Sequence, residues 1–256
     1  MRVLLNIDLG EHPDEPDEFF RLANVVNIAC GGHAGDDVSM LRALYLAHTN
    51  GAFVAAHPSF PDKAGFGRKN MPLSWDVLRE RIADQCASLL HVSRGLHTGW
   101  RGAEAALRGS EPHIVKLHGA LYHAAARDSE AARAVVEGAM RGLANGDLVW
   151  IGPPHGALKE IAAQCKHTYL REGFADRGLL ADGTLIPRGE AGALITDPAR
   201  AVSQAIFLAE SGDVDTLCVH SDTPNALDIA RAVRRALEQK GYLAQSIADI
   251  SKPQIT

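Results

Sequence analysis

The sequence predicts an α/β fold built on a parallel sheet, either closed into a barrel or open. Two observations lead to this prediction. Short apolar segments alternate with helix-like segments along the whole chain. In addition, five of the apolar segments stop on, or a few residues before, an aspartate or a histidine. Because the carboxyl ends of parallel strands meet at one face, these side chains predict one shared pocket.

Seven segments have the length and apolar composition of buried strands. They are residues 3–8, 25–29, 52–56, 113–117, 148–151, 168–171 and 216–219. Asp8 ends the first of them, and His33, His57, His118 and His220 closely follow four others. A single histidine is more commonly an ordinary packing or surface residue. It is the shared placement at strand ends that predicts a pocket.

The segments between the strands carry helix start and stop signals. Asp36 and Ser74 are predicted N-caps, and Gly51 lies where the first of these helices ends. Thr223 and Pro224 predict the N-cap and first residue of another helix. The residues expected to share a face in these helices are Val38, Leu41, Tyr45 and His48; Leu78, Ile82, Cys86 and Leu89; and Ala226, Ile229, Ala230, Val233 and Leu237.

Two stretches interrupt the alternation, at residues 57–71 and 174–192. Both follow a strand, are rich in glycine and proline, and exceed the roughly 2–6 residues of an ordinary strand-to-helix turn. Long loops of this kind commonly carry functional residues. Residues 11–18 are acidic and contain proline, which predicts a solvated loop. No linker divides the chain, so residues 1–256 are predicted to form one domain.

The composition argues against several classes of protein. The formal net charge is −5 at pH 7, so the basic surface typical of nucleic-acid binding is missing. No apolar stretch approaches the ~18 residues of a membrane span. The four cysteines are scattered without a CxxC pair, which favours reduced thiols in a cytoplasmic protein. The sequence also lacks GxxxxGK(S/T), GxGxxG and GxSxG, so no P-loop, dinucleotide site or nucleophile elbow is recognisable.

The side chains at the strand ends suit metal binding or proton transfer. Imidazole nitrogens and a carboxylate oxygen can hold a divalent metal, with Asp8, His33 and His57 as candidate ligands. The same groups can relay protons near neutral pH. Lys116 lies two residues before His118 and therefore faces the same side of its strand. It either pairs with an acid such as Asp8 inside the fold or reaches solvent, and the sequence leaves both open.

Glycines and cations after the strands form a second group of candidates. Residues 27–36, NIACGGHAGD, predict a tight turn that passes close to a ligand, or an ordinary strand-to-helix turn. Arg68 and Lys69 suit a carboxylate or phosphate, or a solvated loop tip. The charged residues of the second long loop are Asp176, Arg177 and Arg188. They are expected to pair with each other, to bind substrate, or to form ordinary surface ion pairs.

Six blocks of sequence together resemble a known family. They are NIDLGE at 6–11, NIACGGHAGD at 27–36, AHPSFPDKAGFGRKNM at 56–71, KLHGALYH at 116–123, FADRGLLADGTLIPR at 174–188 and CVHSDTPNA at 218–226. In order and spacing they are similar to the family of 5-oxoprolinase A subunits, also called LamB/YcsF. The resemblance implies a distorted, TIM-like α/β barrel of the glycoside hydrolase/deacetylase type. It also implies ATP-dependent hydrolysis of 5-oxo-L-proline (pyroglutamate) to L-glutamate, with partner subunits B and C.

Most of the candidate residues match the family pattern, and a few positions depart from it. The matching residues are Asp8, Glu11, Asn27, His33, Asp36, His57, Lys116, His118, Asp176, Arg177, Arg188, His220 and Asp222. The departures are Leu4, Ile7, Gly32, Leu117 and Ser221, where the family usually has Asp, Cys, Phe, Pro and Gly. The changes at Leu4 and Gly32 predict an altered pocket lining, and so leave another lactam or cyclic amide open as substrate.

Each candidate then has a predicted role. The predicted catalytic residues are Asp8, His57, Lys116, His118 and His220, with His118 or His57 as the base that directs water and Asp8 orienting it. The residues predicted to bind substrate or ATP are Asn27, His33, Arg68, Lys69, Asp176, Arg177, Arg188 and Asp222.

Two alternatives stay open at this point. One is a stand-alone metal-dependent hydrolase or deacetylase that uses Asp8, His33 and His57. The other is an accessory protein that binds the lactam without catalysis, with the ATP site on one of the partner subunits, B or C. An assembly of identical chains is also left open.

Overall fold

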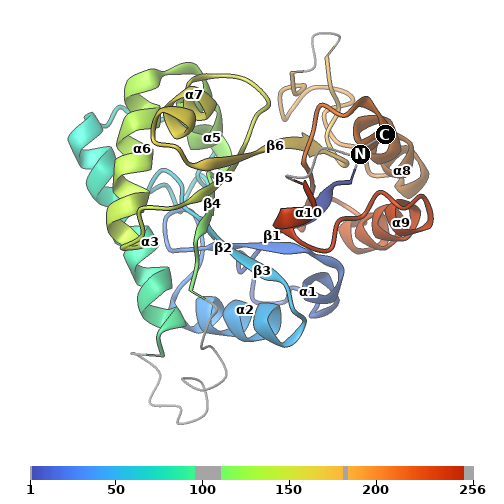
Figure 1. Ribbon diagram of the computed structural model, residues 1–256, viewed down its shortest axis with the longest axis horizontal. Helices are drawn as coiled ribbons and strands as arrows, with labels where there is room; N and C mark the ends of the chain where they lie inside the picture. Colours follow the sequence, from blue (N-terminus) through green and yellow to red (C-terminus); the bar gives the residue numbers. More distant parts are fainter. Residues whose placement is uncertain (1, 96–110, 181–183, 251–256) are drawn as a thin grey trace.

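The computed structural model describes residues 2–95, 111–180 and 184–250. Within them, seven parallel strands close into a barrel in chain order, and β1 pairs with both β2 and β7 (Figure 1). The strands are β1 Leu4–Leu9, β2 Val25–Ala29, β3 Phe53–His57, β4 Ile114–Lys116, β5 Val149–Gly152, β6 Thr168–Phe174 and β7 Thr216–His220. The predicted α/β fold is confirmed, in its closed form. The largest difference is in β6, which runs to Phe174 and therefore includes Glu172.

Helices surround the barrel, with α3 and α6 on one side and α8 and α9 on the other (Figure 1). Those of the described residues are α1 Glu18–Leu22, α2 Asp37–Thr49, α3 Trp75–Ser93, α5 Gly119–Arg127, α6 Ser129–Gly142, α7 Ala157–Gln164, α8 Pro198–Ser211, α9 Ala226–Gln239 and α10 Ile247–Ile250. The predicted N-caps of α2 and α3 are confirmed, because the Asp36 and Ser74 side chains accept from the backbone N–H groups of Ser39 and Val77.

One prediction about a helix start is wrong, and one predicted helix face turns out to be largely exposed. In α2, Val38 and Tyr45 are exposed, because α1, α3, β2 and β3 pack against the opposite face of the helix. The buried side chains of that face are Met40, Ala43, Leu44 and Ala47. In α9, Thr223 is not the N-cap; the helix begins after Asn225, whose φ is 64°. The Thr223 hydroxyl donates instead to Asp176 Oδ2 at 2.6 Å.

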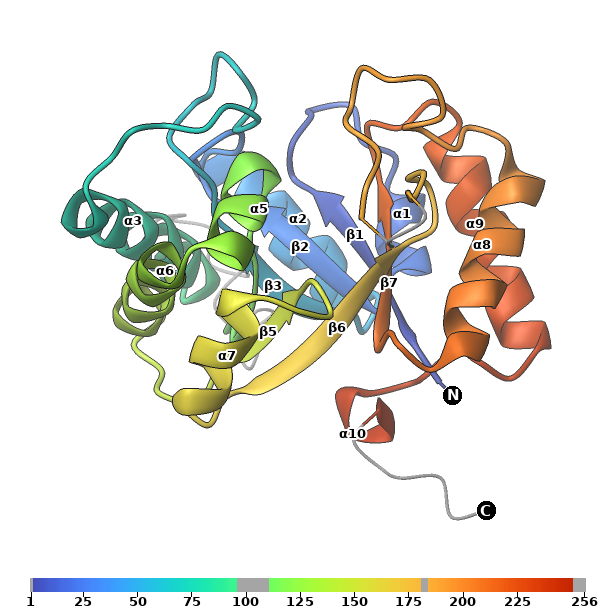
Figure 2. The same ribbon diagram turned by 90° about the horizontal axis from the view of Figure 1, so that it is seen from above.

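The alternation of side chains along the strands builds two separate cores. Residues that point outward, such as Leu5 and Ile7 of β1, pack beneath the helices. Residues that point inward at the start of the strands form a small apolar floor inside the barrel: Leu4, Val25, Ala55, Ile114, Ile151 and Leu170, with Ala244. Ile247 and Ile250 of α10 pack against this floor, and α10 covers that end of the barrel (Figure 2).

The long loops lie at the opposite end, where the strands finish (Figure 2). The prediction that residues 11–18 form a solvated loop is only partly right. Glu15 is buried, and its carboxylate accepts backbone N–H groups from Gly10, Glu11 and His12 at 2.7–3.1 Å. These bonds hold the segment after β1 around the Glu15 carboxylate.

Two further findings concern the described residues only. None of their helices combines the length and the apolar character that a membrane crossing needs. The cysteines at positions 30, 86, 165 and 218 are all free thiols, and only Cys165 is exposed.

Candidate active site

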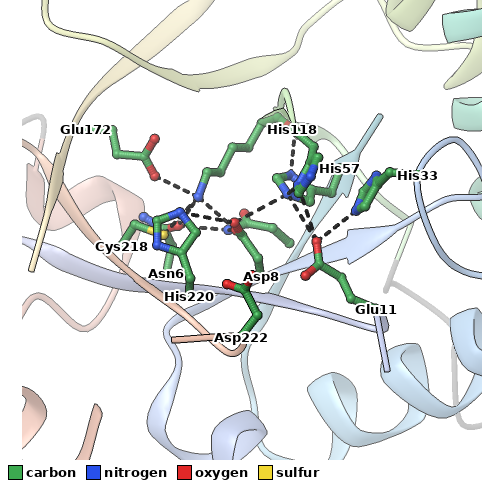
Figure 3. A network of polar contacts seen from close by, with 12 residues as sticks. Asn6, Asp8, Glu11, His33, His57, His118, Glu172, Cys218, His220 and Asp222 are labelled. Carbon is green, nitrogen blue, oxygen red and sulfur yellow. Dashed lines mark hydrogen bonds and ion pairs between the residues drawn. The ribbon is translucent and has the colours of Figure 1, made fainter. Parts of the chain in front are cut away.

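The predicted convergence of strand-end residues is confirmed (Figure 3). His57 Nε2 lies 3.0 Å from His118 Nδ1 and 3.4 Å from Asp8 Oδ2. His220 Nε2 lies 3.9 Å from the same Asp8 oxygen. His33 stacks on His118, with ring centroids 3.6 Å apart. Residues from four strand ends and the loop after β2 therefore share one barrel mouth.

Lys116 lies at the centre of this mouth and is almost fully buried. Its ammonium is 2.8 Å from Asp8 Oδ1 and 2.9 Å from Glu172 Oε1. Of the two possibilities left open by the sequence, Lys116 therefore pairs with acids inside the barrel and does not reach solvent. Its Nζ also lies 3.0 Å from Cys218 Sγ. We call Asp8, Lys116, Glu172 and Cys218 the lysine group. It places one buried cation between two buried carboxylates.

Lys116 and Asp8 of the lysine group stabilise each other's charged forms. Burial alone would lower the pKa of Lys116, but Asp8 holds it well above its usual value. Burial alone would raise the pKa of Asp8, but His57 and then Lys116 hold it well below its usual value. Burial also raises the pKa of the Cys218 thiol well above its usual value, with Asp8 adding to the effect. Cys218 is therefore a neutral thiol.

His220 is oriented by Asp176. Its Nδ1 donates to Asp176 Oδ1 at 3.0 Å, and its backbone N–H donates to Oδ2 at 3.0 Å. Burial would lower the pKa of His220, but the Asp176 carboxylate raises it above 6.5. Asp176 was predicted to bind substrate or a neighbouring cation. Its position instead makes it the residue that fixes the His220 ring and leaves Nε2 directed at the mouth.

A second cluster lies beside the lysine group, and we call Glu11, His33, His57 and His118 the histidine cluster. Glu11 Oε1 is 2.8 Å from His33 Nε2, 3.3 Å from His118 Nδ1 and 3.9 Å from His57 Nε2. Phe66 covers the cluster, with its ring edge-on to His33 and to His118. The cluster is therefore buried between β1, β2, β3, β4 and the loop after β3.

Two carbonyl groups determine which ring nitrogens of this cluster carry hydrogen. His57 Nδ1 lies 2.8 Å from the Lys116 carbonyl, and His118 Nε2 lies 3.0 Å from the Phe66 carbonyl. Because a carbonyl only accepts, both nitrogens must donate. Burial lowers the pKa of His118, and it lowers the pKa of His33 to about 4. Burial would raise the pKa of Glu11, but hydrogen bonds with His118 and His33 hold it well below its usual value.

The rim of the mouth is cationic. Arg68 and Arg188, one from each long loop, both pair with Asp222, and Arg188 Nη1 lies 3.1 Å from Asp222 Oδ2. The Arg68 guanidinium also lies over the Phe66 ring. Lys69 is exposed and joins none of these contacts among the described residues.

Two predicted binding residues point elsewhere. Arg177 donates to the carbonyls of Ala193 and Ile186, so its buried side chain braces the second long loop rather than facing a substrate. Asn27 donates to Asp8 Oδ1 at 2.8 Å and to Asn6 at 2.8 Å, so it fixes the lysine group from below.

Sequence reasoning missed Glu11 and Glu172 as site residues. Glu11 was grouped with an acidic, solvated loop, although it stands in a block that matches the family. Glu172 lies two residues after Leu170, and continuing the alternation of β6 would have placed it inside the barrel.

The ligand-type atoms of the mouth form two groups in the described part of the chain, each with its atoms within 4.8 Å of one another. The first is the histidine cluster, and the second is Asp8, Cys218 and His220. The predicted metal set of Asp8, His33 and His57 spans both groups. The geometry favours Glu11 and His118 in place of Asp8.

Two of the departures from the family pattern now have a structural context. Leu4 belongs to the apolar floor, so the expectation that it lines the pocket is wrong. At Gly32, a Cβ atom would lie 2.2 Å from Gln85 Oε1, and Gln85 is bonded to the Ser59 backbone in the first long loop. Gln85 therefore fills the space beside Gly32.

Comparison with known proteins agrees with this fold. The model of the LamB/YcsF family matches residues 3–252, and this chain belongs to that family. A protein named as the A subunit of 5-oxoprolinase from Pyrococcus abyssi (strain GE5 / Orsay) is 37% identical over 97% of this chain and 99% of its own. One of the same name from Streptomyces coelicolor is 39% identical over 93% of this chain and 96% of its own.

A solved structure shares the fold closely. It is described as the crystal structure of a lactam utilization protein from Thermus thermophilus. It superimposes with a TM-score of 0.84 at 35% identity, covering 96% of this chain and 100% of the other.

Proposed function

We propose that this protein is the A component of an ATP-dependent 5-oxoprolinase, which opens 5-oxo-L-proline to L-glutamate together with subunits B and C. One observation carries the proposal: buried acid–base groups around Lys116 meet a rim with two arginines, in a chain related to proteins named as 5-oxoprolinase A subunits. The names of those relatives support both the substrate and the assembly with other subunits.

The chemistry explains why ATP is needed. A lactam amide is resonance-stabilised and reacts slowly with water. Phosphorylation of its oxygen makes the carbonyl carbon more electrophilic, so that water can attack it. Overall, the lactam, ATP and two water molecules give glutamate, ADP and phosphate. The sequence has no GxxxxGK(S/T) segment, which supports an ATP site on one of the partner subunits, B or C.

The rim suits the carboxylate of the substrate. Arg68 and Arg188 come from different loops and share the single carboxylate of Asp222. Planar guanidinium groups bind carboxylates in a directed manner, so a substrate carboxylate can take the place of Asp222 between them. The lactam ring would then point from the rim toward Lys116 and His220.

His220 suits proton transfer to the lactam nitrogen as the ring opens. Asp176 raises its pKa, so the ring holds a proton near neutral pH and can return it to a leaving amine. Lys116 and Asp8 lie next to it and add charge that stabilises the reacting amide. The base that directs water was predicted to be His118 or His57, and this stays a prediction.

A reconstituted assay tests the proposal. This chain is mixed with subunits B and C, 5-oxoproline and ATP, and both glutamate and ADP are measured. We expect both products in equal amounts, and none when this chain is left out. ADP without glutamate, with all three subunits present, would remove the substrate from the proposal.

A pair of variants tests the role of the rim. Arg188→Gln is expected to raise KM for 5-oxoproline about 10- to 100-fold, since a hydrogen bond to a charged group contributes about 1.5–3 kcal/mol. Arg141→Gln is the control, because Arg141 forms an exposed ion pair with Glu80 at the end of α6. Equal KM values for the two variants would contradict carboxylate binding at the rim.

A third variant separates catalysis from accessory binding. His220→Gln is expected to bind 5-oxoproline in the assembled complex with near-normal affinity but to lose most of kcat. If kcat is unchanged, the proton-transfer role is wrong and the accessory role of this chain is favoured.

A further inference from the structure

We propose that Glu11, His33, His57 and His118 bind one divalent metal ion of the Zn²⁺ type. The inference depends on neither the lactam nor ATP, so it can fail while the proposed function stands. It assigns a cofactor site to the histidine cluster and moves the expected ligand set away from Asp8.

The first argument is the direction of the lone pairs. Because His57 Nδ1–H donates to the Lys116 carbonyl, the neutral ring turns its Nε2 lone pair inward. Because His118 Nε2–H donates to the Phe66 carbonyl, its Nδ1 lone pair also points inward. These two nitrogens face each other at 3.0 Å. Two lone pairs at that distance repel each other unless a proton or a metal ion lies between them.

The second argument is the charge of the cluster. Glu11 adds a carboxylate oxygen to the same space, 3.3 Å from His118 Nδ1. Within the described residues, Glu11 has ion-pair contacts only with His33, His57 and His118. No lysine or arginine of the described chain neutralises it. The imidazoles offset its charge only through hydrogen bonds, and a cation in the same space would offset it directly.

The third argument is spacing. Metal–ligand bonds of about 2.1 Å in a tetrahedron place the donor atoms about 3.4 Å apart. The distances from Glu11 Oε1 to the three imidazole nitrogens, together with the His57–His118 distance, run from 2.8 to 3.9 Å. They bracket that value, and all four donor atoms lie within 4.8 Å of one another, so the cluster would have to contract only slightly to surround one ion.

The surroundings of the four donor atoms also suit a bound Zn²⁺ ion. Histidine ligands commonly donate their other ring N–H to a backbone carbonyl, which is what His57 and His118 do. His33 is different, since its Nδ1 is buried and has no hydrogen-bond partner. In this structure the His33 Nε2–H donates to Glu11 Oε1 at 2.8 Å. Because Nδ1 has no partner to lose, the ring can carry its proton there instead, and Nε2 can then present a lone pair to an ion. Three imidazoles and one carboxylate are donors that Zn²⁺ prefers.

The neighbouring group of Asp8, Cys218 and His220 does not fit an ion in the same way. The Lys116 ammonium already lies 2.8 Å from Asp8 Oδ1 and 3.0 Å from Cys218 Sγ. An added divalent ion would face this buried ammonium at close range. The lysine group thus already contains its cation, and the histidine cluster does not.

The metal would join parts of the chain that are far apart in sequence. Glu11 follows β1, His33 follows β2, His57 ends β3 and His118 follows β4. With four protein donors, an ion would hold these segments together at the mouth. His57 and His118 would then be ligands, which leaves His220 as the acid–base residue.

Metal binding to the purified full-length chain is the test. The chain is treated with a chelator, dialysed and titrated with Zn²⁺ by calorimetry, and Co²⁺ is used as a spectroscopic probe. We expect one ion per chain, visible absorption bands typical of tetrahedral Co²⁺, and a thermal unfolding midpoint that rises with Zn²⁺ concentration. No saturable binding of either ion to the folded chain would overturn the proposal and leave a shared proton as the cation.

Matched variants locate the ion. Glu11→Gln keeps the size of the side chain and removes its charge, and we expect Zn²⁺ affinity to fall at least about 100-fold. His220→Gln removes an imidazole from the competing group and is expected to leave affinity within about threefold. If Glu11→Gln does not fold, His33→Gln and His118→Gln replace it, and circular dichroism reports folding. Unchanged affinity in the folded cluster variants, or a loss only in His220→Gln, contradicts the assignment.

Discussion

The two clusters at the barrel mouth meet the same physical problem in different ways. In both, the carboxylate side chains are almost fully buried. In the lysine group, the Lys116 ammonium lies between Asp8 and Glu172 and offsets part of their charge. In the histidine cluster, the side chain of Glu11 forms ion-pair contacts only with imidazoles among the described residues. Within that part of the chain, the lysine group is complete in the sense that it contains a cation, and the histidine cluster is incomplete because it does not.

This difference predicts different responses to mutation. A buried group that already contains its cation fixes the geometry of the fold and binds no further cation. A buried site that lacks its counter-ion costs folding energy, and such sites are commonly retained for binding or catalysis. Mutations in the lysine group should therefore lower stability in addition to any effect on catalysis, and mutations in the histidine cluster should act mainly on metal binding.

The largest effect is expected from Lys116→Met. It leaves the carboxylates of Asp8 and Glu172 buried without their cation, which typically costs about 3–5 kcal/mol. Urea denaturation measures the loss. Glu172→Gln is the comparison variant and should cost less, because Lys116 keeps Asp8. A loss below about 1 kcal/mol for Lys116→Met would show that the lysine group does not stabilise the barrel.

A smaller effect is expected from Gly67→Ala, which acts mainly on the histidine cluster. The φ of Gly67 is 65°, and a Cβ there would lie 2.9 Å from His33 Cβ and 3.0 Å from His118 Cδ2. The control is Gly241→Ala, where φ is 71° and no atom lies within 4 Å. Both variants carry the backbone strain, but only the first pushes the imidazoles apart.

We expect Gly67→Ala to be less stable than Gly241→Ala by about 1–3 kcal/mol, the usual range for overpacking. Its Zn²⁺ affinity should also fall, while that of Gly241→Ala should not. Equal Zn²⁺ affinity in the two variants would mean that the packing of His33 and His118 does not matter for the ion.

The smallest effect is a shift in the titration of His220, followed by its ring proton signals in NMR spectra. The wild-type residue should titrate with a pKa above 6.5, because Asp176 favours the imidazolium. Its contribution to stability is therefore complete below pH 6.5 and is lost as pH rises through the higher folded pKa. Asp176→Asn should lower the pKa of His220. A wild-type pKa at or below 6.5 would contradict the assignment of Asp176.

The barrel could be predicted because its strands are buried on both sides. Such strands appear as short apolar runs, and all seven were recognised with small errors at their ends. The strand-end rule then placed Asp8, His57, His118 and His220 together without any knowledge of side-chain contacts. The pairing of Lys116 with Asp8 followed from the same alternation of faces, although solvent exposure was an equal alternative.

The missed residues show where this reasoning fails. Glu11 begins an acidic run that is typical of a solvated loop, and only contacts with His33, 22 residues away, reveal that it is buried. Glu172 lies between Arg171 and Gly173, so the strand seemed to end before it. Local composition cannot reveal a carboxylate that is stabilised by a partner more than 50 residues away, as Glu172 is by Lys116.

The direction of the side chains in the loops could not be predicted from the sequence either. Asp176 and Arg177 are adjacent and were expected to pair with each other, to bind substrate or to form ordinary surface ion pairs, but they contact His220 and the Ala193 carbonyl instead. Thr223 has the residue type of a helix cap and instead donates to Asp176. Both outcomes depend on how the backbone turns after a strand, and residue type alone does not determine that turn.

The division of the mouth into a complete and an incomplete cluster is tested most directly by anomalous X-ray scattering. Crystals of the full chain grown with Zn²⁺ are measured above and below the zinc absorption edge. We expect one strong peak among Glu11, His33, His57 and His118. A peak among Asp8, Cys218 and His220 instead, or no peak at the mouth, would contradict this division.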